Sequence, residues 1–379
     1  MQPISNQIWV LVGTRPEVIK QAPLYLELVR KLGKEKVALV GTGQHQELLI
    51  QALEHFGVEP DLTLGFPQDN QTLHASSARI LNGMGDLIQK HKPAWLIVQG
   101  DTTSAAMAAW AAFQNHVRVA HNEAGLRSFD LQHPFPEEAN RRLISIVADI
   151  HFAPTSRAKA VLEKERADPS KILQVGNTGI DALRWTLSKT PPSSTTALMQ
   201  RFSSKGLLPI FVTAHRRENK ENMDAWFSAL RSFLLDHPQL GLVYPFHPNN
   251  AAKPYAEQHL GDLEQAVICP PLSYAETCHF LLECRFVVTD SGGLQEEATS
   301  LGIPTVVCRK TTERMEAVDA GYCRLTEMDP DAVLEAMNWA LAQEKPKNRG
   351  IHVPIFGDGK AAERISDYFS KHFSLRHNA

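Results

Sequence analysis

Three carboxylates stand in separate polar loops of the N-terminal half. Asp101 lies in QGDTTSA, Glu123 in HNEAGLRS and Glu137 in PFPEEANRR, each after a short apolar run or at the start of a helix. Asp suits an N-cap and a first-turn Glu complements the helix dipole, so capping explains each position taken alone. Three acidic loops at one predicted sheet edge fit that explanation less well. Crowded carboxylates raise one another's pKa, which makes acid and base chemistry available near neutral pH.

The most specific local signal is TDSGGLQEEA, in which Ser291, Gly292 and Gly293 connect a predicted strand to a helix. Adjacent glycines let the backbone approach a diphosphate at a helix N-terminus, where free N–H groups and the dipole favour anions. Glu297, one turn into that helix, is placed to accept hydrogen bonds from ribose hydroxyls. Arg314, in TTERMEA after the next predicted strand, supplies a cation. These residues together favour a nucleotide site over a plain capped turn.

Other loops carry cations or histidines after predicted strands. In GTRPEVIK a glycine turn precedes a helix with Arg15 and Lys20, at a spacing that matches neither the dinucleotide fingerprint nor the P-loop. A glycine turn with solvated charges explains this motif alone as well as an anion site does. His215, beside two arginines in TAHRREN, suits either a phosphate contact or a cap. His247, in FHPN, is interpreted as structural or regulatory.

Short apolar runs alternate with helical stretches along the whole chain. Strands that are apolar throughout and joined by helices are typical of parallel sheets covered on both faces. A Pro-, Ser- and Thr-rich stretch at 188–196 predicts a linker or surface loop between two such arrays. Strands are predicted at Ile8–Val12, Val37–Val40, Trp95–Val98, Val117–Ala120, Pro209–Thr213, Leu242–Pro245, Ala266–Cys269, Phe286–Thr289 and Thr305–Cys308.

We therefore predict an α/β protein with two Rossmann-like, doubly wound parallel-sheet domains. The length of 379 residues suits two domains, here 1–186 and 197–359. Ligands of open α/β sheets bind outside the carboxyl ends of the strands, where the polar motifs of both halves lie. The ligand is therefore expected in a cleft between the two domains, which face one another.

Composition excludes several other classes of protein. The net charge of −3 argues against a nucleic-acid partner, and no apolar run is long enough to insert into a membrane. The first residues lack the layout of a signal peptide, so a cytoplasmic location is expected. The five cysteines form no C-x-x-C pair, which predicts free thiols. No metal-binding motif and no NAD fingerprint is present, so neither a metal nor a cofactor is predicted.

Ten ordered blocks spanning the chain resemble the non-hydrolysing UDP-N-acetylglucosamine 2-epimerase family. The resemblance implies two Rossmann-like domains arranged as in GT-B glycosyltransferases, a C-terminal helix (360–379) that packs back on the first domain, and a homodimer. At three positions the chain departs from the family pattern: Met315 replaces proline, Asn122 replaces valine, and Glu47 replaces another polar residue. The ten blocks are GTRPEVIK, GQH, GDTTS, EAGLRS, PEEANRR, GNTGIDAL, AHRREN, TDSGGLQEEA, TTER and GDG.

The same resemblance assigns roles to individual residues. Asp101, Glu123 and Glu137 are implied to face the sugar and share proton transfer, and His215 to manage charge on the departing diphosphate. A second, activating UDP-GlcNAc is implied near Gln44, Glu47 and His247. The residues implied to hold UDP are Arg15, Lys20, His215, Ser291, Gly292, Gly293, Glu297 and Arg314, with Leu272 and Thr277 in the uracil loop.

The implied reaction is a reversible epimerisation at C2 of UDP-N-acetylglucosamine, which supplies UDP-N-acetylmannosamine for surface polysaccharide. No carbonyl acidifies the C2 hydrogen, so the route without NAD expels UDP from C1 while a base removes that proton, and then adds UDP back to the glycal. The residues leave open which carboxylate is the base. A GT-B-type UDP-sugar glycosyltransferase, a hydrolysing epimerase and a catalytically idle UDP-sugar sensor are the alternatives. A 3-substituted or uronic-acid sugar is a further possibility.

Overall fold

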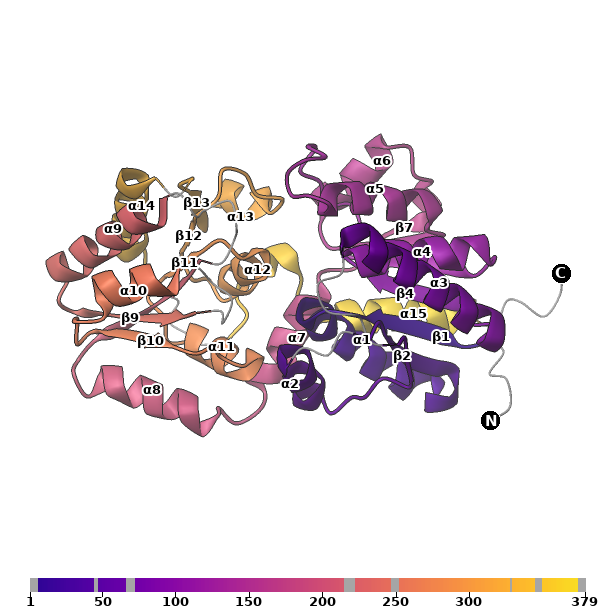
Figure 1. The fold of residues 1–379 in the computed structure, drawn as a ribbon, viewed down its shortest axis with the longest axis horizontal. Helices are drawn as coiled ribbons and strands as arrows, with labels where there is room; N and C mark the ends of the chain where they lie inside the picture. Colours follow the sequence, from indigo (N-terminus) through magenta and orange to yellow (C-terminus); the bar gives the residue numbers. More distant parts are fainter. Residues whose placement is uncertain are drawn as a thin grey trace. The chain divides into compact units, whose positions relative to one another are not determined.

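The computed structural model describes residues 6–43, 47–65, 72–214, 222–246, 252–327, 329–344 and 350–373 (Figure 1). The chain divides into two compact units. Unit 1 comprises Met1–Ala182 and Phe356–Ala379, and unit 2 comprises Leu183–Ile355. Each unit has its own parallel sheet with helices on both faces.

The sheet of unit 1 has the order β3-β2-β1-β4-β5-β6-β7, with every neighbouring pair parallel. The chain runs outward from β1 to β3, returns to the centre at β4, and then runs outward the other way. The loops after β1 and β4 therefore flank the topological switch point, where open α/β sheets bind ligands. The strands are β1 (Ile8–Val12), β2 (Val37–Gly41), β3 (Leu62–Thr63), β4 (Trp95–Gln99), β5 (Arg118–Asn122), β6 (Ile150–Ala153) and β7 (Ile172–Gln174).

Helices cover both faces of this sheet because successive strand residues point to opposite sides. Leu96 belongs to the core formed with α3, α4 and α5, whereas its neighbour Trp95 contacts Phe369 of α15. In Figure 1 the yellow helix α15 lies beside the indigo α1, as their contacts require. The helices are α1 (Arg15–Leu32), α2 (Glu47–Phe56), α3 (Leu73–His91), α4 (Thr103–Gln114), α5 (Glu137–Val147), α6 (Ser156–Lys164) and α15 (Ala361–His372), and α7 (Thr178–Leu187) leads into unit 2.

Unit 2 repeats the same winding with the sheet order β10-β9-β8-β11-β12-β13. Its switch point lies between β8 and β11, where the end residues Thr213 and Thr289 are register partners. The strands are β8 (Leu208–Thr213), β9 (Leu240–Pro245), β10 (Ala266–Cys269), β11 (Val287–Thr289), β12 (Thr305–Val307) and β13 (Cys323–Leu325). The helices are α8 (Ser193–Ser203), α9 (Met223–Asp236), α10 (Lys253–Leu260), α11 (Tyr274–Leu281), α12 (Gly292–Ser300), α13 (Met315–Asp319) and α14 (Pro330–Ala342).

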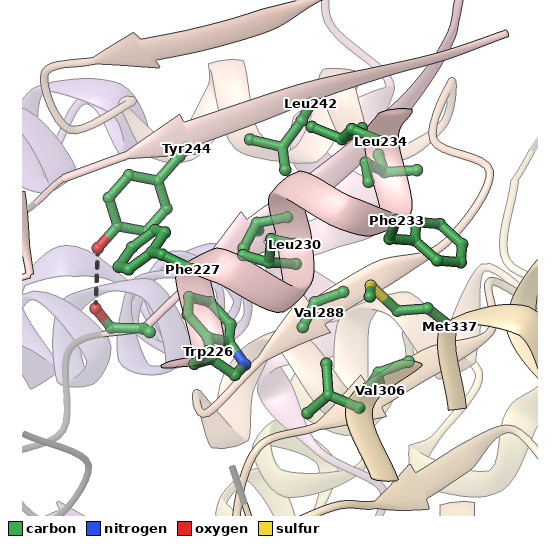
Figure 2. Close-up of a cluster of buried hydrophobic side chains, with 14 of the residues drawn as sticks. Trp226, Phe227, Leu230, Phe233, Leu234, Leu242, Tyr244, Val288, Val306 and Met337 are labelled. Atoms are coloured by element: carbon green, nitrogen blue, oxygen red, sulfur yellow. Dashed lines mark hydrogen bonds between the residues drawn. The ribbon is translucent and has the colours of Figure 1, made fainter. Parts of the chain in front are cut away.

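The core of unit 2 is built around α9. Figure 2 shows Trp226, Phe227 and Leu230 of this helix directed at the sheet, among side chains of β9, β11 and β12 and Met337 of α14. The Tyr244 hydroxyl lies in this core and donates to the carbonyl of Ala214 at 3.3 Å. This hydrogen bond connects β9 to the residue that follows β8, and so helps to fix the start of the loop at the switch point.

The structure corrects one sequence prediction and adds short strands that sequence patterns did not indicate. The stretch predicted as a linker or surface loop over 188–196 becomes helix α8 at Ser193, with Pro192 as its N-cap residue. Proline ahead of a helix is permitted because the first N–H groups lack intrahelical partners anyway. Strands β3, β6, β7 and β13 are the additional ones.

Membrane-spanning helices and metal-binding clusters are both absent from the described part of the chain. No described helix combines the length and the apolarity needed to cross a bilayer. No group of three or more His, Cys, Asp and Glu side chains is placed to hold a metal ion there. All five cysteines have free thiols, as their spacing predicts.

Candidate active site

Glu123 follows β5 and lies buried among polar partners of unit 1. Lys20 Nζ lies 2.5 Å from one carboxylate oxygen, which also accepts from Asn177 Nδ2 at 3.1 Å. The other oxygen accepts from the Gln99 side-chain amide. The backbone of Glu123 has φ +64°, a left-handed conformation that few non-glycine residues adopt and that concentrates at functional sites. The Glu123 carboxylate therefore lies at the carboxyl edge of the sheet, with both of its oxygens hydrogen-bonded.

Asp101 follows β4 and is held from helix α5. Arg141 donates from Nε at 2.9 Å and from Nη2 at 2.5 Å to the same Asp101 oxygen. Asn140 donates to the Asp101 backbone carbonyl at 2.9 Å. Arg141 also reaches Glu138, which is fully buried and accepts from the Ser128 N–H at 2.9 Å. The PEEANRR motif thus fixes the loop that carries Asp101.

Glu137 is the first residue of α5, at the helix N-terminus where a carboxylate is electrostatically favoured. Its Oε2 atom is buried and has no hydrogen-bond partner among the described residues. A buried oxygen without a donor is costly, and groups of this kind are found where a ligand or water completes the site. Glu137 therefore differs from Asp101 and Glu123, which are both ion-paired.

These contacts change the expected electrostatics of the three carboxylates. The sequence predicts crowded carboxylates that raise one another's pKa. The structure instead pairs Glu123 with Lys20 and Asp101 with Arg141. Lys20, predicted to hold UDP, therefore contacts the carboxylate predicted to face the sugar.

The turn after β1 is organised by Glu17, a residue that the sequence motifs did not single out. One Glu17 oxygen accepts from the N–H groups of Gly13 and Thr14 at 2.9 and 2.7 Å. The other accepts from the Thr102 hydroxyl at 2.6 Å. Burial outweighs these hydrogen bonds and raises the pKa of Glu17. Its carboxyl group joins the loops on the two sides of the switch point, and places the half-buried Arg15 at the first position of α1.

In unit 2, Ser291 occupies the N-cap position of α12 without making a capping hydrogen bond from its side chain. Its own N–H donates to the Thr289 hydroxyl at 3.0 Å, which lies 2.7 Å from the Thr213 hydroxyl across the switch point. A Cβ added at Gly293 would meet no atom within 4 Å. Among the described residues the helix N-terminus is therefore open, with its first N–H groups available to an anion.

Arg314 brings a guanidinium group to this helix N-terminus. Its Nε donates to Glu296 at 2.9 Å, and its Nη1 lies 3.0 Å from Glu313. A Cβ at Gly292 would stand 2.8 Å from the Arg314 Cζ, so any larger residue there would have to displace the guanidinium. Helix dipole and cation together make a site suited to a diphosphate.

The remaining unit 2 candidates lie on α11 and α12. Glu297 is buried beside Tyr274, whose pKa is raised far above its usual value, first by burial and then by the charge of neighbours that include Glu297. The Thr277 hydroxyl donates to the Ser273 carbonyl at 2.9 Å, within a helix start capped reciprocally by Ser273 and Glu276. Leu272 is half-buried just before that cap.

Three predicted residues lie outside the described residues: Gln44, His215 and His247. Glu47, predicted with Gln44 and His247 to form a regulatory site, is the exposed first residue of α2. The regulatory site stays a prediction.

Sequence reasoning also missed residues that hold the candidates in place. Their common signal is a polar side chain inside one of the quoted motifs. They are Glu17, Gln99, Glu138, Arg141, Asn177, Glu296 and Glu313.

Comparisons with known proteins bear directly on this arrangement. Residues 29–370 match the family described as UDP-N-acetylglucosamine 2-epimerase. This chain belongs to that family. The UDP-N-acetylglucosamine 2-epimerase of Bacillus subtilis is 37% identical over 372 residues, covering 98% of this chain and 96% of the relative. That of Escherichia coli K12 is 37% identical over 366 residues, covering 95% and 97%.

Solved structures of the UDP-N-acetylglucosamine 2-epimerase family share the fold. The Neisseria meningitidis UDP-GlcNAc 2-epimerase bound to UDP-GlcNAc has a TM-score of 0.88 and 33% identity, covering 97% of this chain and 100% of that one. The S. aureus MnaA–UDP structure has a TM-score of 0.89 and 35% identity, covering 98% and 97%. The predictions of the enzyme family and of two Rossmann-like α/β domains are confirmed.

Proposed function

We propose that this epimerase-family chain interconverts UDP-N-acetylglucosamine and UDP-N-acetylmannosamine without hydrolysis. The observation that carries the proposal is the pairing of Glu123 and Asp101 with separate cations at one sheet edge. A glycosyltransferase needs one general base, whereas inversion at C2 needs a proton acceptor on one face of the sugar and a donor on the other. Relatives crystallised with UDP-GlcNAc and with UDP support this substrate.

The reaction begins with elimination. A carboxylate takes the C2 proton as the C1–O bond breaks, and the bonding electrons leave with UDP, which gives a glycal that is planar at C2. Protonation of C2 from the opposite face and return of the UDP oxygen to C1 complete the inversion. Asp101, Glu123 and Glu137 are the proposed proton-transfer groups. Glu137, with its unpartnered buried oxygen, has room for a sugar contact.

UDP must remain bound while the glycal turns over. The open N-terminus of α12, with Ser291, Gly292 and Gly293, is proposed to hold the diphosphate together with Arg314. Charge that develops on the leaving diphosphate is stabilised by cations and backbone N–H groups that are already oriented. Arg15 and His215 are proposed to add to this stabilisation, Glu297 to bind the ribose, and Leu272 and Thr277 to border the uracil.

The test is a proton NMR experiment in deuterated water with EDTA-treated protein and UDP-GlcNAc. The expected result is UDP-ManNAc that carries deuterium at C2, formed without added NAD or metal. Release of free ManNAc and UDP would identify a hydrolysing epimerase instead. UDP binding without C2 exchange would contradict epimerisation of this sugar and favour another UDP-sugar, and then glycosyl transfer.

We also propose a cytoplasmic homodimer that supplies UDP-ManNAc to surface polysaccharide synthesis. Free thiols at all five cysteines suit a reducing compartment. Phe113 of α4 and Ile146 of α5 are 52% and 79% exposed on neighbouring helices, which is the composition expected of a subunit contact if they share one apolar patch. Light scattering at micromolar concentration should give twice the chain mass of 42.2 kDa. A monomer mass would contradict the dimer.

A further inference from the structure

His121, in the middle of β5, is a fully buried histidine that the proposed reaction does not use. Its Nε2 atom lies 2.8 Å from the Gly100 carbonyl oxygen. A carbonyl oxygen only accepts, so Nε2 must carry the proton and donate it. Its Nδ1 atom is buried and has no partner among the described residues. The ring is therefore a neutral Nε2–H tautomer with a single directed contact.

The environment of His121 keeps the imidazole neutral. Burial, reinforced by the charges of His151 and Arg127, lowers the pKa of His121 to about 3, against the opposing effects of the Gly100 carbonyl and Glu123. The ring therefore donates the same hydrogen bond, as a neutral imidazole, at neutral pH.

The His121 hydrogen bond is made to the Gly100 turn, which lies between Asp101 and the Gln99 side chain that binds Glu123. Gly100 has φ +68° and donates its own N–H to the Asn122 carbonyl at 3.0 Å, so its peptide groups are held on both sides. Gln99, immediately before it, binds Glu123, and Asp101 follows it directly. A Cβ built on Gly100 would lie only 3.7 Å from the Glu123 carboxylate. A shift of Gly100 therefore moves both Asp101 and Gln99, whose side-chain amide donates to Glu123.

We propose that His121 is a positioning residue whose Nε2–H fixes the Gly100 turn and, through it, Asp101 and Glu123. This role rests on the proposed epimerase function for its kinetic consequence. A substitution at a residue that touches no substrate can still lower the rate by roughly 100-fold if it displaces a reacting group by about 1 Å.

The chain offers a matched control on the neighbouring strand. His151 of β6 is the register partner of His121, is also buried, and also has an unpartnered Nδ1. Burial lowers its pKa to about 4. It stands one strand farther from Gly100, so its substitution perturbs the same sheet without touching the turn.

The experiment compares His121→Leu, His121→Gln and His151→Leu. Leucine keeps the volume but removes the donor, whereas the glutamine amide reaches about as far as Nε2 and restores it. His121→Leu should lower kcat about 10- to 100-fold with KM changed less than threefold. His121→Gln should recover kcat to within about threefold, and His151→Leu should keep kcat within about twofold.

Hydrogen exchange of the 99–103 backbone supplies a readout that does not depend on catalysis. His121→Leu should exchange faster at the Gly100 amide, His121→Gln should restore protection, and His151→Leu should leave it unchanged. Unaltered exchange and kcat in His121→Leu would overturn the positioning role, as would equal losses in both leucine variants or failure of glutamine to rescue. An inactive wild-type chain would instead refute the proposed function, while the exchange data would still decide whether His121 holds the turn.

Discussion

At the scale of single residues, the ion pair between Lys20 and Glu123 joins two of the candidate site residues. Both side chains are almost entirely buried, with exposed fractions of 11% and 4%. Removing one member of a buried pair strands the other charge and costs about 3–5 kcal/mol. Lys20→Met should therefore lower the free energy of unfolding by about 3 kcal/mol, measured by urea denaturation.

The control for this prediction is the double variant Lys20→Met, Glu123→Gln. The amide removes the stranded charge but can still accept from Asn177, so the double variant should be more stable than Lys20→Met alone. A double variant no more stable than Lys20→Met would contradict the coupling of the pair, because removing both partners of a coupled pair costs less than the sum of the separate losses.

Two adjacent glutamates show which residue roles the sequence could predict and which it could not. The PEE motif predicts two first-turn carboxylates, but residue types do not distinguish Glu137 from Glu138. The structure does distinguish them: Glu138 accepts from Arg141, Arg142 and the Ser128 N–H, whereas one Glu137 oxygen has no partner among the described residues. Glu17 escaped notice because its importance lies in a contact with Thr102, 85 positions away.

At the scale of elements, the proposed anion site at the start of α12 depends on the close approach of the Arg314 guanidinium to Gly292. Gly292→Ala would place its Cβ 2.8 Å from that group and displace it from Glu296 and Glu313. A charge-assisted contact contributes about 1.5–3 kcal/mol. UDP affinity, measured by calorimetry, should therefore fall roughly 10- to 100-fold.

The mechanism of that loss is testable with Arg314→Met. If Gly292→Ala acts by displacing Arg314, the double variant should bind UDP about as weakly as Arg314→Met alone. A further large loss in the double variant would mean that the alanine obstructs the diphosphate itself.

Asp181 attaches the C-terminal helix to unit 1 and makes that attachment pH-dependent. Its two oxygens accept from the N–H groups of Ala361 and Ala362 at 3.1 and 2.8 Å. Burial raises the pKa of Asp181 to about 6. Because the folded-state pKa exceeds the ordinary value of 3.8, this group's stability contribution is complete below about pH 4 and is lost as pH rises through 6.

The pH prediction is measured against Asp181→Asn, which cannot titrate. The stability advantage of wild type should shrink by about 2 kcal/mol between pH 4.5 and pH 6.5. Urea unfolding, followed by pulsed hydrogen exchange of the backbone amides in unit 1, measures this difference in stability. A constant difference between the two proteins would contradict the raised pKa.

Elements that the sequence patterns did not indicate share a physical cause. Strand β6 carries His151 inside a four-residue run, and β13 carries Arg324 inside three residues, so neither has a continuous apolar signal. Central strands such as β1 and β4 are buried on both faces and were predicted from their composition. Short strands at the edge of a sheet or next to it depend on pairing with a neighbour, which local sequence does not encode.

At the scale of the whole molecule, the chain leaves unit 1, builds unit 2 and returns. The return is specified by contacts between distant positions: Lys31 with Asp367 at 2.5 Å, and Arg364 with the Val175 carbonyl at 2.9 Å. Phe369 packs edge-on against Trp95 and Phe152, with ring centroids 5.4 and 6.0 Å apart. No periodicity predicts these partners, and only the family resemblance suggested the return.

Phe369 is therefore expected to stabilise unit 1 although it lies in the last helix of the chain. It is fully buried, and truncating a buried Phe to Ala costs about 3–5 kcal/mol. Phe369→Ala should accelerate hydrogen exchange in β4 and α1 while α9 and β9 keep their protection. Phe233→Ala, a matched deletion in the core of unit 2, should give the opposite pattern. Because each unit has its own core, equal loss of protection in both units from either variant would contradict this assignment of α15 to unit 1 alone.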